Sequence, residues 1–175
     1  MQFTVPQDDL NKIIYAYHYD PFQVLGAHIV KAGKKKVVSI RALLPFAEQA
    51  WVVPASGEPQ PFERMEGTEF FEAQFADDAV FPYEIRTLDK VGQTRQAPDP
   101  YSFLPVLGDL DLQFFNEGTH FRTYNKLGAQ VMTHGGVRGV CFAVWAPEAA
   151  RVSVVGDFNG WDGRRHQLRQ RGSSG

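Results

Sequence analysis

Four side chains in one short turn near the C-terminal end of the sequence could contact a sugar. The turn has the sequence GDFNGWDG and places Trp161 beside three short polar side chains, which are Asp157, Asn159 and Asp162. An indole ring can stack on the apolar C–H face of a pyranose, while carboxylates and amides hydrogen-bond the hydroxyl groups around its rim. The alternative is that Trp161 folds back and covers the open end of a β-sandwich. The residues alone leave both interpretations open.

The sequence offers no catalytic or metal-binding set. Its histidines show no His-x-x-x-His spacing, and the single Cys141 cannot form a thiolate cluster for zinc. No glycine-rich phosphate-binding loop is present. The carboxylate pairs Asp77–Asp78 and Asp109/Asp111 lie in turn-like segments, whereas glycoside chemistry needs two carboxyl groups that face each other across a cleft. We therefore expect no catalytic residue, no metal and no cofactor in this chain.

Composition and charge exclude several kinds of partner. The 175 residues are 43% hydrophobic and 22% charged, with a formal net charge of −2. That is enough apolar material for a core, and it gives no overall positive field for nucleic acid or anionic lipid. No apolar run approaches the roughly 18–20 residues that cross a bilayer, and the N-terminal residues lack the features of a secretory signal. The single cysteine suits a reducing compartment, so we expect a cytoplasmic protein.

The elements that must position the turn are mostly short strands. Residues 8–19 have helical spacing, and Asp20, Pro21 and Gly26 suit the cap, start and end of one further helical turn. After these residues the helical period disappears. Trp51 and Trp145 each fall within a strand-like run, and we expect both side chains to lie in the core. The runs rich in β-branched and aromatic residues are 37–44, 49–53, 69–75, 80–88, 137–146, 150–155 and 166–171. Strands at this spacing predict an antiparallel sandwich.

An internal repeat with an offset of 102 residues decides the architecture. Leu25-Gly26-Ala27 recurs as Leu127-Gly128-Ala129, and Val52-Val53 recurs as Val154-Val155. Gly33, Pro45 and Ala47 also find identical residues at the same offset. Their shared register predicts two copies of one β unit, each of domain size. Copy one has no aromatic residue at the position that corresponds to Trp161, which is Pro59.

The repeat and the proline-rich segment 96–105 predict the domain organisation. We expect an N-terminal β-sandwich domain over residues 1–105, a linker over 106–116 and an incomplete second sandwich over 117–175. The predicted fold class is all-β: an immunoglobulin-like β-sandwich with a short N-terminal helix, followed by a truncated second β-sandwich of the same type. Copy two lacks the later strands of copy one, so we expect the front part of a longer protein that self-associates through unpaired strand edges.

Three segments resemble the N-terminal region of bacterial glycogen branching enzymes, in the order in which they occur there. They are YDPFQVLGAH (19–28), FNEGTH (115–120) and FAVWAPEAARVSVVGDFNGWDGRRH (142–166). The resemblance implies an extra N-terminal β-sandwich, then the start of a glycogen-binding-type module in which Trp161 contacts sugar. A catalytic (β/α)8 barrel of the α-amylase superfamily would follow. Its aspartate nucleophile and glutamate acid/base would transfer an α-1,4-glucan chain to an α-1,6 linkage with retention, and no residue here matches their motifs.

Two functions follow as hypotheses. The first is the non-catalytic front of a branching enzyme, which positions glucan, braces the barrel or influences the length of chain transferred. Its expected partners are α-glucan, as glycogen or malto-oligosaccharide, and the catalytic barrel of the same chain. The second is a stand-alone glycogen- or starch-binding scaffold module without enzyme activity. The coding sequence that follows Gly175 would separate the two.

Overall fold

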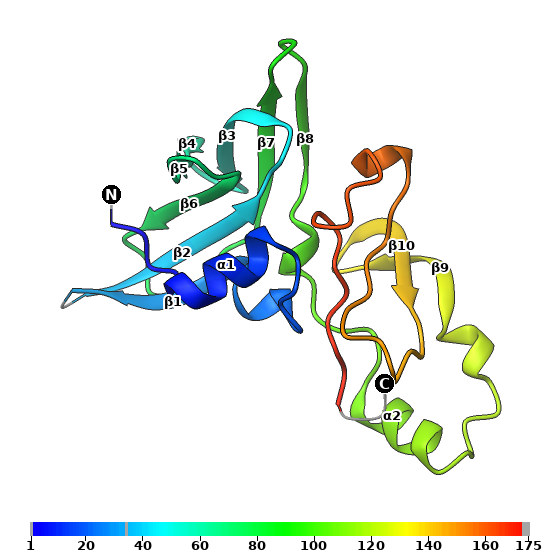
Figure 1. Ribbon diagram of the computed structural model, residues 1–175. Helices are drawn as coiled ribbons and strands as arrows, with labels where there is room; N and C mark the ends of the chain where they lie inside the picture. The colour runs from blue at the N-terminus through cyan, green and yellow to red at the C-terminus, as the bar shows by residue number, and fades with distance from the viewer. Residues whose placement is uncertain (1, 34, 173–175) are drawn as a thin grey trace. The chain divides into compact units, whose positions relative to one another are not determined.

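The computed structural model describes residues 2–33 and 35–172, which divide into two compact units. Unit 1 is Met1–Ser102 and unit 2 is Phe103–Gly175. No helix in the described part of the chain is long and apolar enough to span a lipid bilayer. The all-β fold class predicted from the strand pattern is confirmed, with two short α-helices beside the strands (Figure 1).

Unit 1 is a β-sandwich of two four-stranded antiparallel sheets (Figure 1). The first sheet has the strand order β1-β2-β6-β5 and the second has the order β4-β3-β7-β8. The strands of the first sheet are β1 (Gly26–Ala32), β2 (Lys35–Leu43), β5 (Glu63–Arg64) and β6 (Phe70–Phe75). Those of the second are β3 (Ala47–Pro54), β4 (Gln60–Pro61), β7 (Tyr83–Asp89) and β8 (Thr94–Pro98). The 3-10 helix η2 (Pro100–Ser102) ends the unit.

Alternation along the strands builds the core of unit 1. Val38 and Ile40 of β2 are fully buried and share one core cluster with Phe71 of β6 and with Val52 and Ile85 of the other sheet. Residues two apart on a strand face the same side, so these apolar positions lie between the two sheets. Burial of this surface is the main stabilising contribution to the unit.

A second cluster covers the opposite face of the first sheet. Helix α1 (Gln7–Ile14) buries Leu10 and Ile13 against Leu43 of β2 and Phe70 of β6. The predicted helix over 8–19 is thus shorter than expected. It ends because Ala16 takes a left-handed φ of 57°, which a continuing α-helix does not allow. The predicted further turn is confirmed as η1 (Pro21–Gln23), where the Asp20 carboxylate accepts a hydrogen bond from the Phe22 backbone N–H.

A buried ion pair ties the N-terminal segment to this face. Glu72 and Arg41 are direct neighbours across β6 and β2, and their side chains are 0% and 6% exposed. The Glu72 carboxylate accepts hydrogen bonds from the Thr4 backbone N–H (3.0 Å) and from Ser39 Oγ (2.9 Å). Arg41 donates to Thr4 Oγ1 at 2.8 Å. Buried charges need such partners, so this network fixes the chain that precedes α1.

Unit 2 contains fewer regular elements. Its elements are α2 (Asp109–Asn116), η3 (Thr123–Asn125), the antiparallel hairpin of β9 (Gly128–His134) and β10 (Val137–Ala143), and η4 (Asp157–Asn159). The strands predicted at 150–155 and 166–171 do not form, and one isolated bridge joins Ser153 to Gln167. Two hydrogen bonds flank this bridge, from Val154 N to His166 O and from Leu168 N to Val152 O. A pair of segments with no third strand beside it is marginally stable, so the pairing stays local.

The repeat predicted from the sequence is confirmed, and it extends further than the identities indicated. Three elements of unit 2 each begin 102 residues after an element of unit 1. Helix α1 begins at residue 7 and α2 at 109, η1 begins at 21 and η3 at 123, and β1 begins at 26 and β9 at 128. The helix ends also match, because Ala16 and Gly118 have φ of 57° and 70°. Residues 109–116, which lie within the predicted linker over 106–116, form a helix that repeats α1.

The two copies differ in how far they bury apolar side chains. Among the described residues, every buried hydrophobic side chain lies in unit 1. In unit 2 the strand residues Val131, Val140 and Phe142 are exposed. The core position expected for Trp145 is wrong in this structure, because its side chain is 54% exposed.

Candidate functional site

The turn that carries Trp161 is built around two glycines. Gly156 leads into η4, and a Cβ at this position would lie 2.7 Å from the Phe158 ring, so a larger residue here would displace that ring. Gly160 follows η4 with a φ of 64°, in the left-handed region that glycine adopts without strain. The Gly156 carbonyl accepts hydrogen bonds from the backbone N–H groups of Asn159 (3.1 Å) and Trp161 (3.0 Å). These contacts close the chain into a tight loop with Trp161 at its end.

Trp161 points into solvent. Its side chain is 67% exposed, so the alternative in which it folds back and covers a sandwich is wrong. The backbone at Trp161 has a φ of 60°, which is uncommon for a residue other than glycine and costs free energy. Its indole N–H donates a 2.9 Å hydrogen bond to Asp157 Oδ1. The ring is thus fixed at its polar edge while most of its surface remains available.

Asn159 lies beneath the turn and is 0% exposed. Its Oδ1 accepts from the Gly156 N–H at 2.9 Å, and its Nδ2 donates to the Val154 carbonyl at 2.8 Å. The same amide nitrogen lies 3.0 Å from His166 Nδ1. The side chain has no path to a ligand, and the direct sugar contact expected of Asn159 does not fit this geometry. It holds the loop in shape instead.

His166 completes the support of the turn and was not identified from the sequence. Because the Asn159 amide donates to Nδ1, the neutral imidazole carries its proton on Nε2. The ring also packs edge-on against Phe158, with centroids 5.3 Å apart. Burial and the neighbouring Arg165 charge hold the pKa of His166 below its usual value of 6.5. The neutral form is therefore the one that the turn requires.

Asp162 is engaged by Arg164. The Arg164 guanidinium donates to both Asp162 oxygens, at 3.0 Å from Nε to Oδ1 and at 2.6 Å from Nη2 to Oδ2. This hydrogen-bonded pairing lowers the pKa of Asp162. Of the four residues predicted for the site, the structure presents Trp161 and Asp157 together at the surface. It places Asn159 inside the turn and Asp162 in an ion pair.

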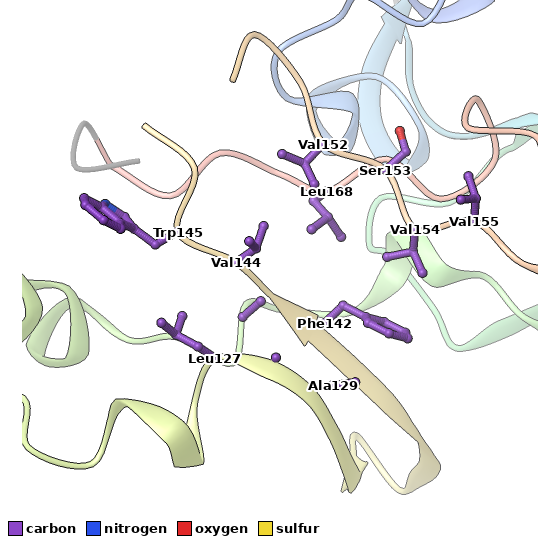
Figure 2. Close-up of a pocket in the computed structure, with 12 residues that line it drawn as sticks. Leu127, Ala129, Phe142, Val144, Trp145, Val152, Ser153, Val154, Val155 and Leu168 are labelled. Carbon is purple, nitrogen blue, oxygen red and sulfur yellow. The ribbon is translucent and has the colours of Figure 1, made fainter. Parts of the chain in front are cut away.

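A separate apolar hollow of about 600 Å³ lies in unit 2 (Figure 2). Phe142, Val144 and Trp145 on one side and Val152, Val154 and Leu168 on the other are among its lining residues. The polar side-chain groups of the lining are the Ser153 hydroxyl and the Trp145 indole N–H. A sugar buried there would leave its hydroxyl groups without partners, so the hollow does not suit a glucan. In the described part of the chain, no three His, Cys, Asp or Glu side chains are placed to hold a metal ion.

Comparison with known families places this arrangement in a class of protein. Residues 126–175, which contain the Trp161 turn, match the family described as carbohydrate-binding module 48 (isoamylase N-terminal domain). Residues 6–101, which span most of unit 1, match the family described as "alpha-1,4-glucan branching enzyme GlgB, N-terminal domain". The chain belongs to this branching-enzyme family, as the three sequence segments indicated.

Individual relatives agree with this assignment. The chain is 45% identical over 170 residues to the 1,4-alpha-glucan branching enzyme GlgB of Nostoc sp., a match that covers 95% of this chain and 22% of the relative. It is 46% identical over 171 residues to the enzyme of the same name from Paramagnetospirillum magneticum, which covers 98% of this chain and 22% of the relative. The chain thus spans about a fifth of the length of these relatives.

Among solved structures, a pullulanase from Paenibacillus barengoltzii in complex with maltohexaose and alpha-cyclodextrin matches with a TM-score of 0.37 and 21% identity. The match covers 75% of this chain and 16% of the pullulanase chain. Similarity at this level supports no inference about function.

Proposed function

We propose that the chain is the non-catalytic N-terminal part of a glycogen branching enzyme. In this proposal the parent enzyme cleaves an α-1,4-glucan chain and rejoins it as an α-1,6 branch through a retaining double displacement, in the cytoplasm. The support is the match of both units to families of glucan-processing proteins, at 45% identity to named branching enzymes. The 175-residue chain itself is expected to be inactive, because no part of its sequence matches the nucleophile and acid/base motifs of the family.

The contribution of unit 2 is a contact with α-glucan at Trp161. The observation that carries this proposal is the ring itself, which is 67% exposed although its N–H is bonded to Asp157. Exposure of a large aromatic ring is unfavourable in water, and a strained backbone adds to the cost. A stacked glucosyl ring would cover the indole face. One Asp157 oxygen takes the indole N–H, and the other can accept a hydroxyl hydrogen bond.

Isothermal titration of the chain with maltoheptaose tests this contact. We expect Trp161→Ala to weaken binding by about threefold to tenfold, since an aromatic stack contributes about 0.5–1.5 kcal/mol beyond the area that it buries. Trp145→Ala is the matched control, because it removes another exposed indole of the same unit, which lines the hollow. Equal affinity of wild type and Trp161→Ala would refute the site.

The domain organisation is part of the same proposal, with a sandwich over residues 1–105, a connecting segment over 106–116 that carries helix α2, and an incomplete sandwich over 117–175. The hollow of unit 2 would be the inner face of the second sandwich, because its apolar lining needs a cover. The hairpin β9–β10 also has free edges within the described residues, and these would promote self-association in the absence of that cover.

Within a full-length enzyme, unit 2 would hold glucan near the catalytic barrel and influence the length of chain transferred, and unit 1 would brace the barrel. A stand-alone scaffold that binds glycogen remains the competing proposal. The coding sequence after Gly175 separates them, because a barrel of about 250 residues or more would establish the enzyme. An immediate stop codon would favour the scaffold.

A further inference from the structure

A row of exposed tyrosines in unit 1 has no role in the function proposed above. Tyr15, Tyr17 and Tyr19 follow helix α1 and are 73%, 54% and 55% exposed, while the residues between them, Ala16 and His18, are each 3% exposed. Single exposed aromatics are normal, but three exposed rings within five residues put an unusual amount of aromatic surface on one short segment.

The backbone beneath this row is fixed. Tyr15 N–H donates to the Asn11 carbonyl at 3.0 Å, and Tyr17 N–H donates to the Lys12 carbonyl at 2.9 Å. The Asp20 N–H donates to His18 Nδ1 at 3.1 Å. The rings therefore project from a rigid base rather than from a loose loop.

Tyr19 is held by contacts of both its ring and its hydroxyl group. One face stacks on the His18 imidazole, with centroids 5.2 Å apart and planes 14° from parallel. Its hydroxyl donates to Gln23 Oε1 at 3.0 Å, and the Gln23 amide donates to Asp20 Oδ2 at 3.2 Å. The ring orientation is set before any ligand arrives, which reduces the entropy cost of binding.

Comparison of the two copies shows that the fold does not need Tyr15 and Tyr17, whereas Tyr19 corresponds to another aromatic residue, Phe121. At the offset of 102 residues, Tyr15 and Tyr17 correspond to Glu117 and Thr119. The same backbone hydrogen bonds form there, from Glu117 N to Gln113 O at 3.0 Å and from Thr119 N to Phe114 O at 2.9 Å. A loop that closes equally well on glutamate and threonine does not require tyrosine. The rings of Tyr15 and Tyr17 are therefore available for another role. The Tyr19 position does not serve a core either, because Phe121 in copy two is 88% exposed.

We propose that Tyr15, Tyr17 and Tyr19 form a second α-glucan contact, on unit 1. Tyrosine rings offer flat surfaces for the C–H faces of successive glucosyl units, and their hydroxyl groups remain compatible with water. Asp20 and the exposed Gln23 stand beside Tyr19 as hydrogen-bond partners for sugar hydroxyls. The choice of α-glucan as the ligand rests on the proposed function. A protein partner on the same surface is the competing explanation.

The test is isothermal titration of the 175-residue chain with maltoheptaose, in four forms. These are wild type, Tyr17→Thr/Tyr19→Ala, Trp161→Ala and the combination of all three substitutions. Tyr17→Thr introduces the residue that copy two uses at the same place, so the loop is expected to keep its fold. Tyr124→Ala is the control for loss of an exposed tyrosine, since Tyr124 is 69% exposed. Far-ultraviolet circular dichroism checks the fold of every form.

We expect the double tyrosine variant to bind about threefold to tenfold more weakly than wild type, and Tyr124→Ala to bind as wild type does. In the Trp161→Ala background the tyrosine substitutions should remove most of the remaining binding. If Trp161→Ala weakens binding and the tyrosine variant does not, the second contact is refuted while the proposed function stands. If only the tyrosine variant weakens binding, the second contact stands and the Trp161 site is refuted. If wild type does not bind maltoheptaose, both are refuted.

Discussion

At the scale of single residues, the Trp161 turn separates the residue that we propose contacts α-glucan from the residues that hold it in place. Trp161 and Asp157 are exposed and joined by the indole hydrogen bond. Asn159 is buried, and its amide makes hydrogen bonds to the backbone of the turn itself. Sequence reasoning grouped all of these as sugar contacts because their types suit hydroxyl groups. The type of a side chain does not reveal whether the local backbone already uses it.

Asn159→Ala is expected to disturb glucan binding without removing a sugar contact. The substitution leaves the Gly156 N–H and the Val154 carbonyl without their partner, at a cost of about 1–3 kcal/mol in the stability of the turn. We expect faster hydrogen exchange of the Trp161 indole N–H and weaker binding of maltoheptaose. Asn116→Ala, an exposed asparagine at the end of α2, should change neither. Unchanged indole exchange in Asn159→Ala would contradict the supporting role.

The turn is also expected to loosen in mild acid. The pKa of His166 in the folded chain lies below 6.5, so folding favours its neutral form. This contribution is fully present above pH 6.5 and is lost as the pH falls through the lower folded value, because the unfolded chain then binds more protons. Protonation of Nδ1 would also remove the acceptor that faces the Asn159 amide. The protection factor of the Trp161 indole N–H, which corrects for the pH dependence of intrinsic exchange, should therefore fall below pH 6.5. A protection factor that is constant between pH 7 and pH 5 would contradict this.

At the scale of elements, the pattern of apolar residues along the sequence predicted the strands of unit 1 correctly. The strands of unit 1 follow the alternation of apolar residues, and the sheets bury that pattern. Helix α2 was missed because Asp109-Leu110-Asp111-Leu112 alternates with a period of two, as a strand would. The offset of 102 residues from α1 was the signal that could have found it. The segments 150–155 and 166–171 have a strand-like composition but do not form the predicted strands. A strand also needs a hydrogen-bonding partner along its length, and composition does not show whether that partner is present.

The ion pair beneath the N-terminal segment gives a prediction at this scale. Glu72→Ala would leave the Arg41 charge buried without its neighbour and would release Thr4. Loss of one partner of a buried pair costs about 3–5 kcal/mol, so we expect a large fall in the free energy of unfolding of unit 1. Urea denaturation followed by circular dichroism measures it. Glu48→Ala, at an exposed position on β3, is the matched control and should change stability by less than about 0.5 kcal/mol. Equal effects of the two substitutions would contradict the role of the pair.

At the scale of the whole molecule, one β unit occurs twice with unequal burial. Unit 1 has two apolar clusters that enclose its first sheet from both faces, whereas the hydrophobic side chains described in unit 2 are all at least partly exposed. Stability should therefore differ between the units. We expect slow amide exchange in β2, β3, β6 and β7 and fast exchange in β9 and β10, measured by mass spectrometry on the isolated chain. Equal protection of both units in a monomer would contradict this.

The central claim is that the exposed indole of Trp161 meets α-glucan, and indole N–H resonances test it most directly. The chain has three tryptophans, so a two-dimensional spectrum shows one indole signal from unit 1 and two from unit 2. On titration with maltoheptaose we predict a large, saturable shift of the Trp161 signal, with smaller or no shifts for Trp51 and Trp145. A Trp161 signal that stays in place while the chain binds the sugar would contradict the claim.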